Sequence, residues 1–165
     1  MDNPHTLEID LSYLAAMIDG EGCVTLERTG RRRKGNGEMG LSPKIIVTNT
    51  NLTIIGHVVN LFKRVGVTPH IKSSMSGRRN KACYWVTVQG LTKVKVVLDV
   101  VMPYLVGKVA QAKLLLDFIS CRGDLPKGLK YGPVEMGILD KIRALNFRGV
   151  PTTEDYELAH YNYVK

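Results

Sequence analysis

Two carboxylates, Asp19 and Glu21, stand where an apolar helical stretch gives way to glycine. The apolar side chains before them recur at helical spacing and share one face, namely Leu11, Leu14, Ala15 and Ile18. The pattern predicts a helix from about residue 11 to residue 20 or 22, with Asp10 as its N-cap. Acids at its C-terminal end oppose the negative end of the helix dipole, where cations are normally favoured. Because local rules tend to be broken where function requires it, this helix end is a candidate site.

The alternative interpretation is an amphipathic core helix that is stopped by glycine and followed by two solvated acids. Ala15, Ala16 and Gly20, however, leave one side of the helix almost without side-chain bulk. A second copy of the chain could therefore approach closely about a two-fold axis. The residues of this predicted dimer interface are Leu11, Leu14, Ala15, Ala16, Ile18 and Asp19.

Pairing of two chains in this way would bring the two copies of Glu21 together. Carboxylates that meet repel each other unless a cation lies between them, and hard oxygen ligands select Mg²⁺. Such a metal can activate water and offset the charge of a phosphodiester under attack. Asp19 is expected to cap or position the helix rather than to bind the metal.

The charge of the chain is concentrated in one segment. The net charge is +8 over 165 residues, but residues 1–27 carry −6, residues 28–95 carry +13 and residues 96–165 carry +1. A segment this one-sided repels itself unless it meets a polyanion, which indicates nucleic acid as the partner.

Two predicted hairpins lie in or next to this basic segment. Alternating apolar residues predict strands over residues 23–29, 41–48, 67–74 and 82–89, with helices over residues 52–65, 91–102, 108–120 and 133–145. The expected fold is an α+β domain of order αββαββα, with a four-stranded antiparallel sheet backed by helices and a polar face left open. One domain over residues 1–149 and a loosely held tail over residues 150–165 are expected.

A two-stranded ribbon fits the major groove of DNA, where outward side chains reach the base edges. Trp85 is either a sheet-surface anchor or a stacking contact for bases. The predicted DNA-binding residues are Thr25, Glu27, Thr29, Arg31, Arg33, Ser42, Lys44, Ile46, His70, Lys72, Cys83, Trp85 and Thr87 on the sheet, and Arg78, Arg79 and Lys81 on backbone phosphates.

The string from Leu14 to Gly22, L-A-A-M-I-D-G-E-G, resembles the LAGLIDADG motif of homing endonucleases, and it departs from that motif at Ala16, Met17, Gly20 and Glu21. The likeness extends over about residues 10–146 and fits the single-motif, homodimeric type. It implies site-specific double-strand cleavage of a long, nearly palindromic DNA site, with short 3′ overhangs. Mg²⁺ is the implied cofactor; Mn²⁺ is expected to substitute, and Ca²⁺ to bind without supporting cleavage.

The same resemblance implies roles for individual residues. Glu21 matches the metal-binding acid, and the Gly20 carbonyl is a second metal ligand. Asn49, in V-T-N-T-N, would position the hydrolytic water, and Lys108, in P-Y-L-V-G-K, would assist the attack. Each has a structural alternative, because Asn49 is also a residue type that caps a helix and Lys108 could be an exposed lysine of a first turn.

Other functions fit the sequence less well. A DNA-binding regulator or RNA maturase of the same fold would not need Glu21, and a glycosidase using Asp19 and Glu21 would leave the +13 segment unexplained. The four scattered histidines show no zinc-ligand spacing. Three cysteines without metal-like spacing indicate a reducing compartment. We expect an intracellular protein, cytoplasmic or organellar with access to double-stranded DNA, without a membrane segment or a small-molecule cofactor.

Overall fold

The computed structural model describes residues 4–29, 40–74, 82–123, 125 and 129–147. A helix and a hairpin are followed by a second helix and hairpin and then by further helices, as the sequence predicted. The elements are α1 (Pro4–Glu21), β1 (Gly22–Thr29), β2 (Gly40–Asn49), α2 (Leu52–Arg64), β3 (His70–Ser74), β4 (Cys83–Gln89), α3 (Leu91–Val101), the 3-10 turn η1 (Met102–Tyr104), α4 (Val109–Gly123) and α5 (Pro133–Leu145).

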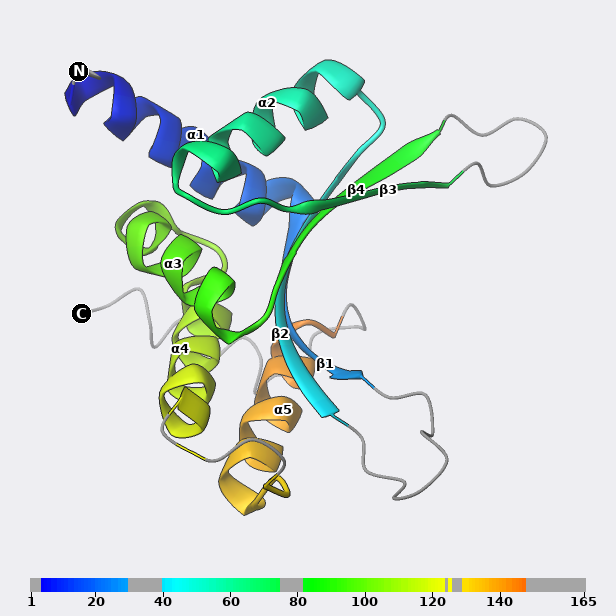
Figure 1. Cartoon of the computed structure of the whole chain (residues 1–165), viewed down its shortest axis with the longest axis vertical. Coiled ribbons are helices and arrows are strands. Elements are labelled where there is room, and N and C mark those ends of the chain that lie inside the picture. Colours follow the sequence, from blue (N-terminus) through cyan, green and yellow to red (C-terminus); the bar gives the residue numbers. More distant parts are fainter. Residues whose placement is uncertain (1–3, 30–39, 75–81, 124, 126–128, 148–165) are drawn as a thin grey trace, which may run out of the picture.

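The strands form one antiparallel sheet in the order β1-β2-β4-β3. The helices lie on one side of this sheet, and its other face is left open (Figure 1). Because successive residues of a strand point to opposite faces, Val24 and Leu26 on the helix side are buried, whereas Cys23, Thr25 and Glu27 on the open side are half-buried. The predicted α+β fold is confirmed.

The core fills the space between the sheet and the helices. Burial of one large apolar side chain contributes about 1.5–3 kcal/mol, so the core holds the helices on one side and leaves the other face of the sheet to solvent. Its largest fully buried side chains are Phe62, Phe118, Leu14, Ile18, Leu26, Ile45, Leu98, Leu115, Leu139, Ile142, Val24 and Val47. None of the helices in the described ranges combines the length and apolar character needed to cross a bilayer.

α1 begins at Pro4, earlier than the sequence predicted. Asp10 is therefore inside the helix and forms an ion pair with Arg64 of α2 instead of acting as an N-cap. The first two turns gave no periodic signal because their large apolar residues, Leu7 and Ile9, are 42% and 57% exposed. Proline in a first helical turn, as at Pro4, is the signal that was available.

The second hairpin also differs in extent from the prediction. β3 begins at His70, and Val67, expected within the strand, is buried in the connection that follows α2. Gly66 ends α2 as predicted, with a φ of 82° that glycine adopts without strain. All five residues of β3 are exposed, which is consistent with its place at the edge of the sheet.

A polar cluster ties α4 and α5 to β2. The Arg122 guanidinium lies 3.3 Å from Glu135 and 4.5 Å from the centre of the Tyr131 ring. The Tyr131 hydroxyl in turn accepts a hydrogen bond of 2.9 Å from the Leu41 N–H. Burial alone would raise the pKa of Glu135, but the hydrogen bonds from the Gly132 N–H and from Arg122 lower the pKa overall. Glu135 therefore stays ionised and holds this corner of the fold together.

Candidate functional site

The junction between α1 and β1 is built on a close backbone approach at Gly22. A Cβ atom at this position would lie 2.4 Å from the Ile18 carbonyl oxygen and 2.8 Å from the Ile18 Cα. Only glycine lets the helix pass directly into the strand here. Glu21 is the last residue of α1 and is exposed at this junction, so the turn fixes the backbone that carries the predicted metal-binding acid.

Asp19 caps another helix of the same chain. Its carboxylate oxygens accept hydrogen bonds from the Val106 N–H at 2.7 Å and from the Lys108 N–H at 2.9 Å, immediately before α4. A carboxylate at the N-terminus of a helix satisfies backbone donors and complements the helix dipole. The structural role predicted for Asp19 is confirmed, and its place near the end of α1 is explained by the helix that it caps.

Lys108 completes this exchange between the two helices. Its Nζ donates to the Asp19 backbone carbonyl, and a cation near the C-terminus of a helix is favourable. Each helix thus supplies the group that the end of the other requires. The contact brings the Lys108 side chain to the end of α1, beside the segment that carries Glu21.

Asn49 lies at the matching end of β2. Because Gly22 pairs with Val47, β2 continues two residues past the start of β1. Its last residue, Asn49, therefore lies at the same end of the sheet as the α1–β1 junction. Its Oδ1 accepts a hydrogen bond of 2.8 Å from the Asn51 N–H. Asn51 is the N-cap of α2, accepting from the Thr53 N–H at 2.9 Å. Asn49 therefore supports the cap without being the cap itself.

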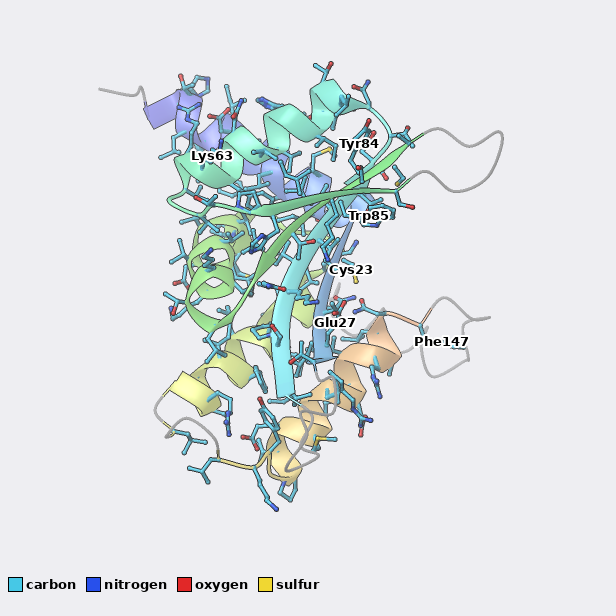
Figure 2. The ribbon with its side chains drawn as sticks, turned by 45° about the vertical axis from the view of Figure 1, so that its right-hand side comes forward. Cys23, Glu27, Lys63, Tyr84, Trp85 and Phe147 are labelled. Carbon is cyan, nitrogen blue, oxygen red and sulfur yellow. The ribbon has the colours of Figure 1, made fainter. Side chains whose placement is uncertain are left out.

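The open face carries the predicted DNA-binding side chains in rows across the strands. Residues paired across antiparallel strands lie on the same face, so the register sets these rows. They are Ile46, Thr87 and His70; Thr25 with Lys44; Glu27 with Ser42; and Trp85 with Lys72. Cys23, Glu27 and Trp85 are seen along this face in Figure 2.

The remaining predicted DNA contacts lie at the ends of the hairpins. Thr29 is exposed at the last position of β1, and Cys83 is half-buried at the first position of β4. Five predicted contacts, Arg31, Arg33, Arg78, Arg79 and Lys81, lie outside the described residues. Their roles stay predictions.

One copy of the junction offers few side-chain ligands for a metal. Within the described part of the chain, no three His, Cys, Asp or Glu side chains are grouped to hold a metal ion. With Asp19 committed to α4, the junction offers the exposed Glu21 carboxylate and the backbone carbonyls of the last turn of α1. A divalent ion that prefers six or more oxygen ligands would need further ligands from elsewhere.

A family model described as a LAGLIDADG-like domain matches residues 8–102, which include most of α1, the four strands, α2 and α3. The chain belongs to the LAGLIDADG-like domain family. A search of curated proteins found no match.

Solved structures share the fold of this LAGLIDADG-like domain at low sequence identity. The homing endonuclease I-CvuI, in complex with the I-CreI target DNA, aligns with a TM-score of 0.65 and 21% identity over 99% of this chain and 100% of its own. The homing endonuclease I-TnaI gives a TM-score of 0.55 and 14% identity over 91% and 93%. The intron-encoded homing endonuclease I-CeuI, complexed with DNA, gives 0.56 and 16% over 74% and 59%.

The exposed side of α1 in this LAGLIDADG-like domain differs from the predicted interface. Leu14, Ala15 and Ile18 have no exposed surface in the single chain, because they pack into its own core. They cannot form a dimer contact, and this part of the prediction is wrong. Ala16 and Gly20 are exposed, and Leu11 and Asp19 are half-buried. A Cβ atom at Gly20 would meet nothing within 4 Å, so the fold of the single chain does not require glycine there.

Two polar residues that position the site of this LAGLIDADG-like domain were not singled out from the sequence. The Asn146 amide, at the end of α5, donates a hydrogen bond of 2.9 Å to the Val24 carbonyl near the start of β1. Gln111 of α4 is buried and reaches Asn146 at 3.5 Å. The only sequence signal was the resemblance of residues 138–146 to a frequent C-terminal helix of the family.

Proposed function

We propose that this chain is a site-specific DNA endonuclease that acts as a homodimer and hydrolyses phosphodiester bonds with Mg²⁺. The observation that carries the proposal is the position of Glu21. Its exposed carboxylate stands at one end of an open sheet face that bears lysine, histidine and hydrogen-bonding side chains. The homing endonuclease I-CvuI, which has the same fold, has been solved with its own DNA target in the presence of Ca²⁺ and with the I-CreI target in the presence of Mg²⁺, where the DNA was not cleaved.

Two features support the homodimer, namely the single acid at the junction and the exposed side of α1. One chain supplies a single acid at the junction, whereas a two-fold axis along α1 would bring a second Glu21 to the same place. Ala16 and Gly20 are the exposed small residues of α1 that would let two backbones approach closely. The interface proposed here therefore lies on Ala16 and Gly20 and not on the buried stripe of the helix.

The roles of the chain's own residues follow from their contacts. Glu21 and the Gly20 carbonyl would hold Mg²⁺, which, when bound, makes water a better nucleophile and offsets charge on the phosphate. Lys108 uses one of three ammonium donors on the Asp19 carbonyl, so two remain for a phosphate oxygen. Asn49 has its Oδ1 engaged by Asn51, and its amide N–H groups can hold the attacking water.

The deciding experiment compares Glu21→Gln with the unaltered chain. A library of random duplexes is digested with Mg²⁺ and the new ends are sequenced; a parallel incubation with Ca²⁺ measures binding alone. The unaltered chain is expected to leave short 3′ overhangs within a nearly palindromic site. Glu21→Gln should bind that site and leave it intact, because glutamine keeps the shape of the side chain but lacks its charge.

Cleavage by Glu21→Gln at the unaltered rate would remove Glu21 from the metal site. If both proteins bind DNA and neither cuts with Mg²⁺ or Mn²⁺, the chain is a DNA-binding protein of this fold without nuclease activity.

A further inference from the structure

The open face of the sheet carries one carboxylate, and it belongs to Glu27. Glu27 is the only acidic residue in the sequences of β1, β2, β3 and β4. The basic residues of these strands that share the open face are Lys44 on β2 and, at the far edge of the sheet, His70 and Lys72 on β3. An acid here opposes the attraction of the face for the phosphates of DNA, so its presence calls for a specific reason.

Glu27 is paired with the lysine on the next strand. The Lys44 ammonium contacts the Glu27 carboxylate. Thr25 is the direct partner of Lys44 and Ser42 is the partner of Glu27, so the pair runs diagonally across the two strands, within reach of long side chains. The Lys44 side chain is 17% exposed and that of Glu27 is 42% exposed. A DNA duplex that approaches the face therefore meets the carboxylate before the ammonium.

This arrangement acts differently on phosphates and on base edges. A phosphate is repelled by Glu27 and competes with that carboxylate for the Lys44 ammonium. A base edge that offers a hydrogen-bond donor, such as the N4 amino group of cytosine, satisfies the carboxylate while Lys44 stays paired. Edges that present acceptors alone leave the carboxylate dehydrated, with Lys44 as its one donor. Specificity of this kind comes from a repulsive element as much as from an attractive one.

We propose that Glu27 is a specificity-determining residue that restrains Lys44, weakens binding to non-specific DNA and selects a base with an amino donor, cytosine or adenine, on the strand that it faces. The proposal rests on the DNA-binding function proposed above. Glu27 is five positions beyond Gly22 along β1, which corresponds to about 17 Å at the rise of a strand. At 3.4 Å per base pair, the selected pair lies about five base pairs outside each cut, once in each half of the site.

The test measures binding of Glu27→Gln to a duplex without a target site, over a series of salt concentrations and with Ca²⁺ in place of Mg²⁺. With Lys44 released to a phosphate, log K should fall with log salt more steeply by about 0.9, the value for one phosphate. That slope corresponds to non-specific binding about five-fold tighter near 0.15 M salt. Selection from a random library should also show relaxed base preference at the two symmetric positions.

Asp99→Asn is the matched control, because it removes the same charge from the Lys95–Asp99 ion pair (2.7 Å) on α3. Because α3 lies on the covered side of the sheet (Figure 1), the slope of log K against log salt for Asp99→Asn should equal that of the unaltered chain. In a Lys44→Gln background, Glu27→Gln should no longer steepen the slope, since the lysine that it restrains is absent.

The outcomes separate the two proposals. If the unaltered chain binds no DNA at any salt concentration, the proposed function fails and this inference falls with it. If the unaltered chain binds DNA but Glu27→Gln behaves like Asp99→Asn in slope and base preference, only this inference is overturned. A Glu27→Gln protein that steepens the slope equally with and without Lys44 shows a general charge effect, which also overturns it.

Discussion

Replacing Asp19 with alanine should destabilise the chain without removing Glu21, the proposed metal-binding acid. Asp19 accepts hydrogen bonds from the Val106 and Lys108 N–H groups at 2.7 and 2.9 Å, and alanine would leave both donors without a side-chain partner. Glu21 would keep its place, because the turn that carries it is set by the contact between Gly22 and Ile18. Substitution of Asp19 should therefore change the stability of the chain, whereas substitution of Glu21 should change its activity.

The size of the effect follows from the exposure of the cap. Loss of an N-cap side chain costs about 0.5–2 kcal/mol, and hydrogen bonds to a charged acceptor lie at the upper end of the usual range. Asp19 is half-buried, so water replaces part of what is lost. We expect a decrease of about 1–2 kcal/mol in the free energy of unfolding, combining these terms. At about 2–4 °C per kcal/mol for a chain of this size, the Tm should fall by about 2–8 °C.

The assay is urea unfolding followed by circular dichroism at one fixed chain concentration, combined with calorimetric titration of Ca²⁺ into the complex with DNA. Asp19→Asn, which keeps one acceptor oxygen, should lie between Asp19→Ala and the unaltered chain in stability. Glu21→Gln should unfold at the unaltered midpoint and lose Ca²⁺ binding. If Asp19→Ala keeps the unaltered midpoint and instead loses Ca²⁺, Asp19 is a metal ligand and the capping explanation is refuted.

Two further predictions concern the glycine junction and the dimer. Gly22→Ala should lower the free energy of unfolding by about 1–3 kcal/mol through overpacking. Gly56→Ala, at an exposed and open position of α2, should raise the free energy of unfolding by about 1 kcal/mol. Equal stability of the two variants would refute the close backbone approach at Gly22. The chain should sediment near twice its mass of 18.3 kDa, and Ala16→Arg should leave a folded monomer, with Asp140→Arg on α5 as control. A monomer of the unaltered chain on DNA would exclude the shared metal site.

The element order was predictable because each element carries its own periodicity. The alternation of Val24 and Leu26 with polar residues predicted β1, and the side of the sheet on which they are buried was correct. The same reasoning failed for the first turns of α1, where Leu7 and Ile9 are exposed and leave no buried stripe. Periodicity reports burial within an element, so a helical segment that packs against little of its own chain gives no such signal.

The surface of α1 shows a second limit of the sequence. Leu14, Ala15 and Ile18 were predicted to meet a partner chain, and the chain's own core covers them completely. A sequence shows that a stripe must be covered, but which chain covers it depends on how the helices pack. Likewise, the Tyr131 contact with Leu41 and the Asn146 contact with Val24 join residues 90 and 122 positions apart. No local pattern encodes such contacts, although they attach β1 and β2, which carry part of the open face, to the C-terminal part of the domain.

The violated charge rule at the end of α1 has a different explanation for each acid. The backbone of Asp19 belongs to the last turn of α1, but its carboxylate lies at the N-terminus of α4, where negative charge is favoured. Lys108 provides the cation that the end of α1 lacks. Among the described residues, the Glu21 carboxylate makes no hydrogen bond or ion pair, so contacts within the chain explain the place of Asp19 but not that of Glu21. The divalent cation proposed above would give this exposed carboxylate at the Gly22 junction its role.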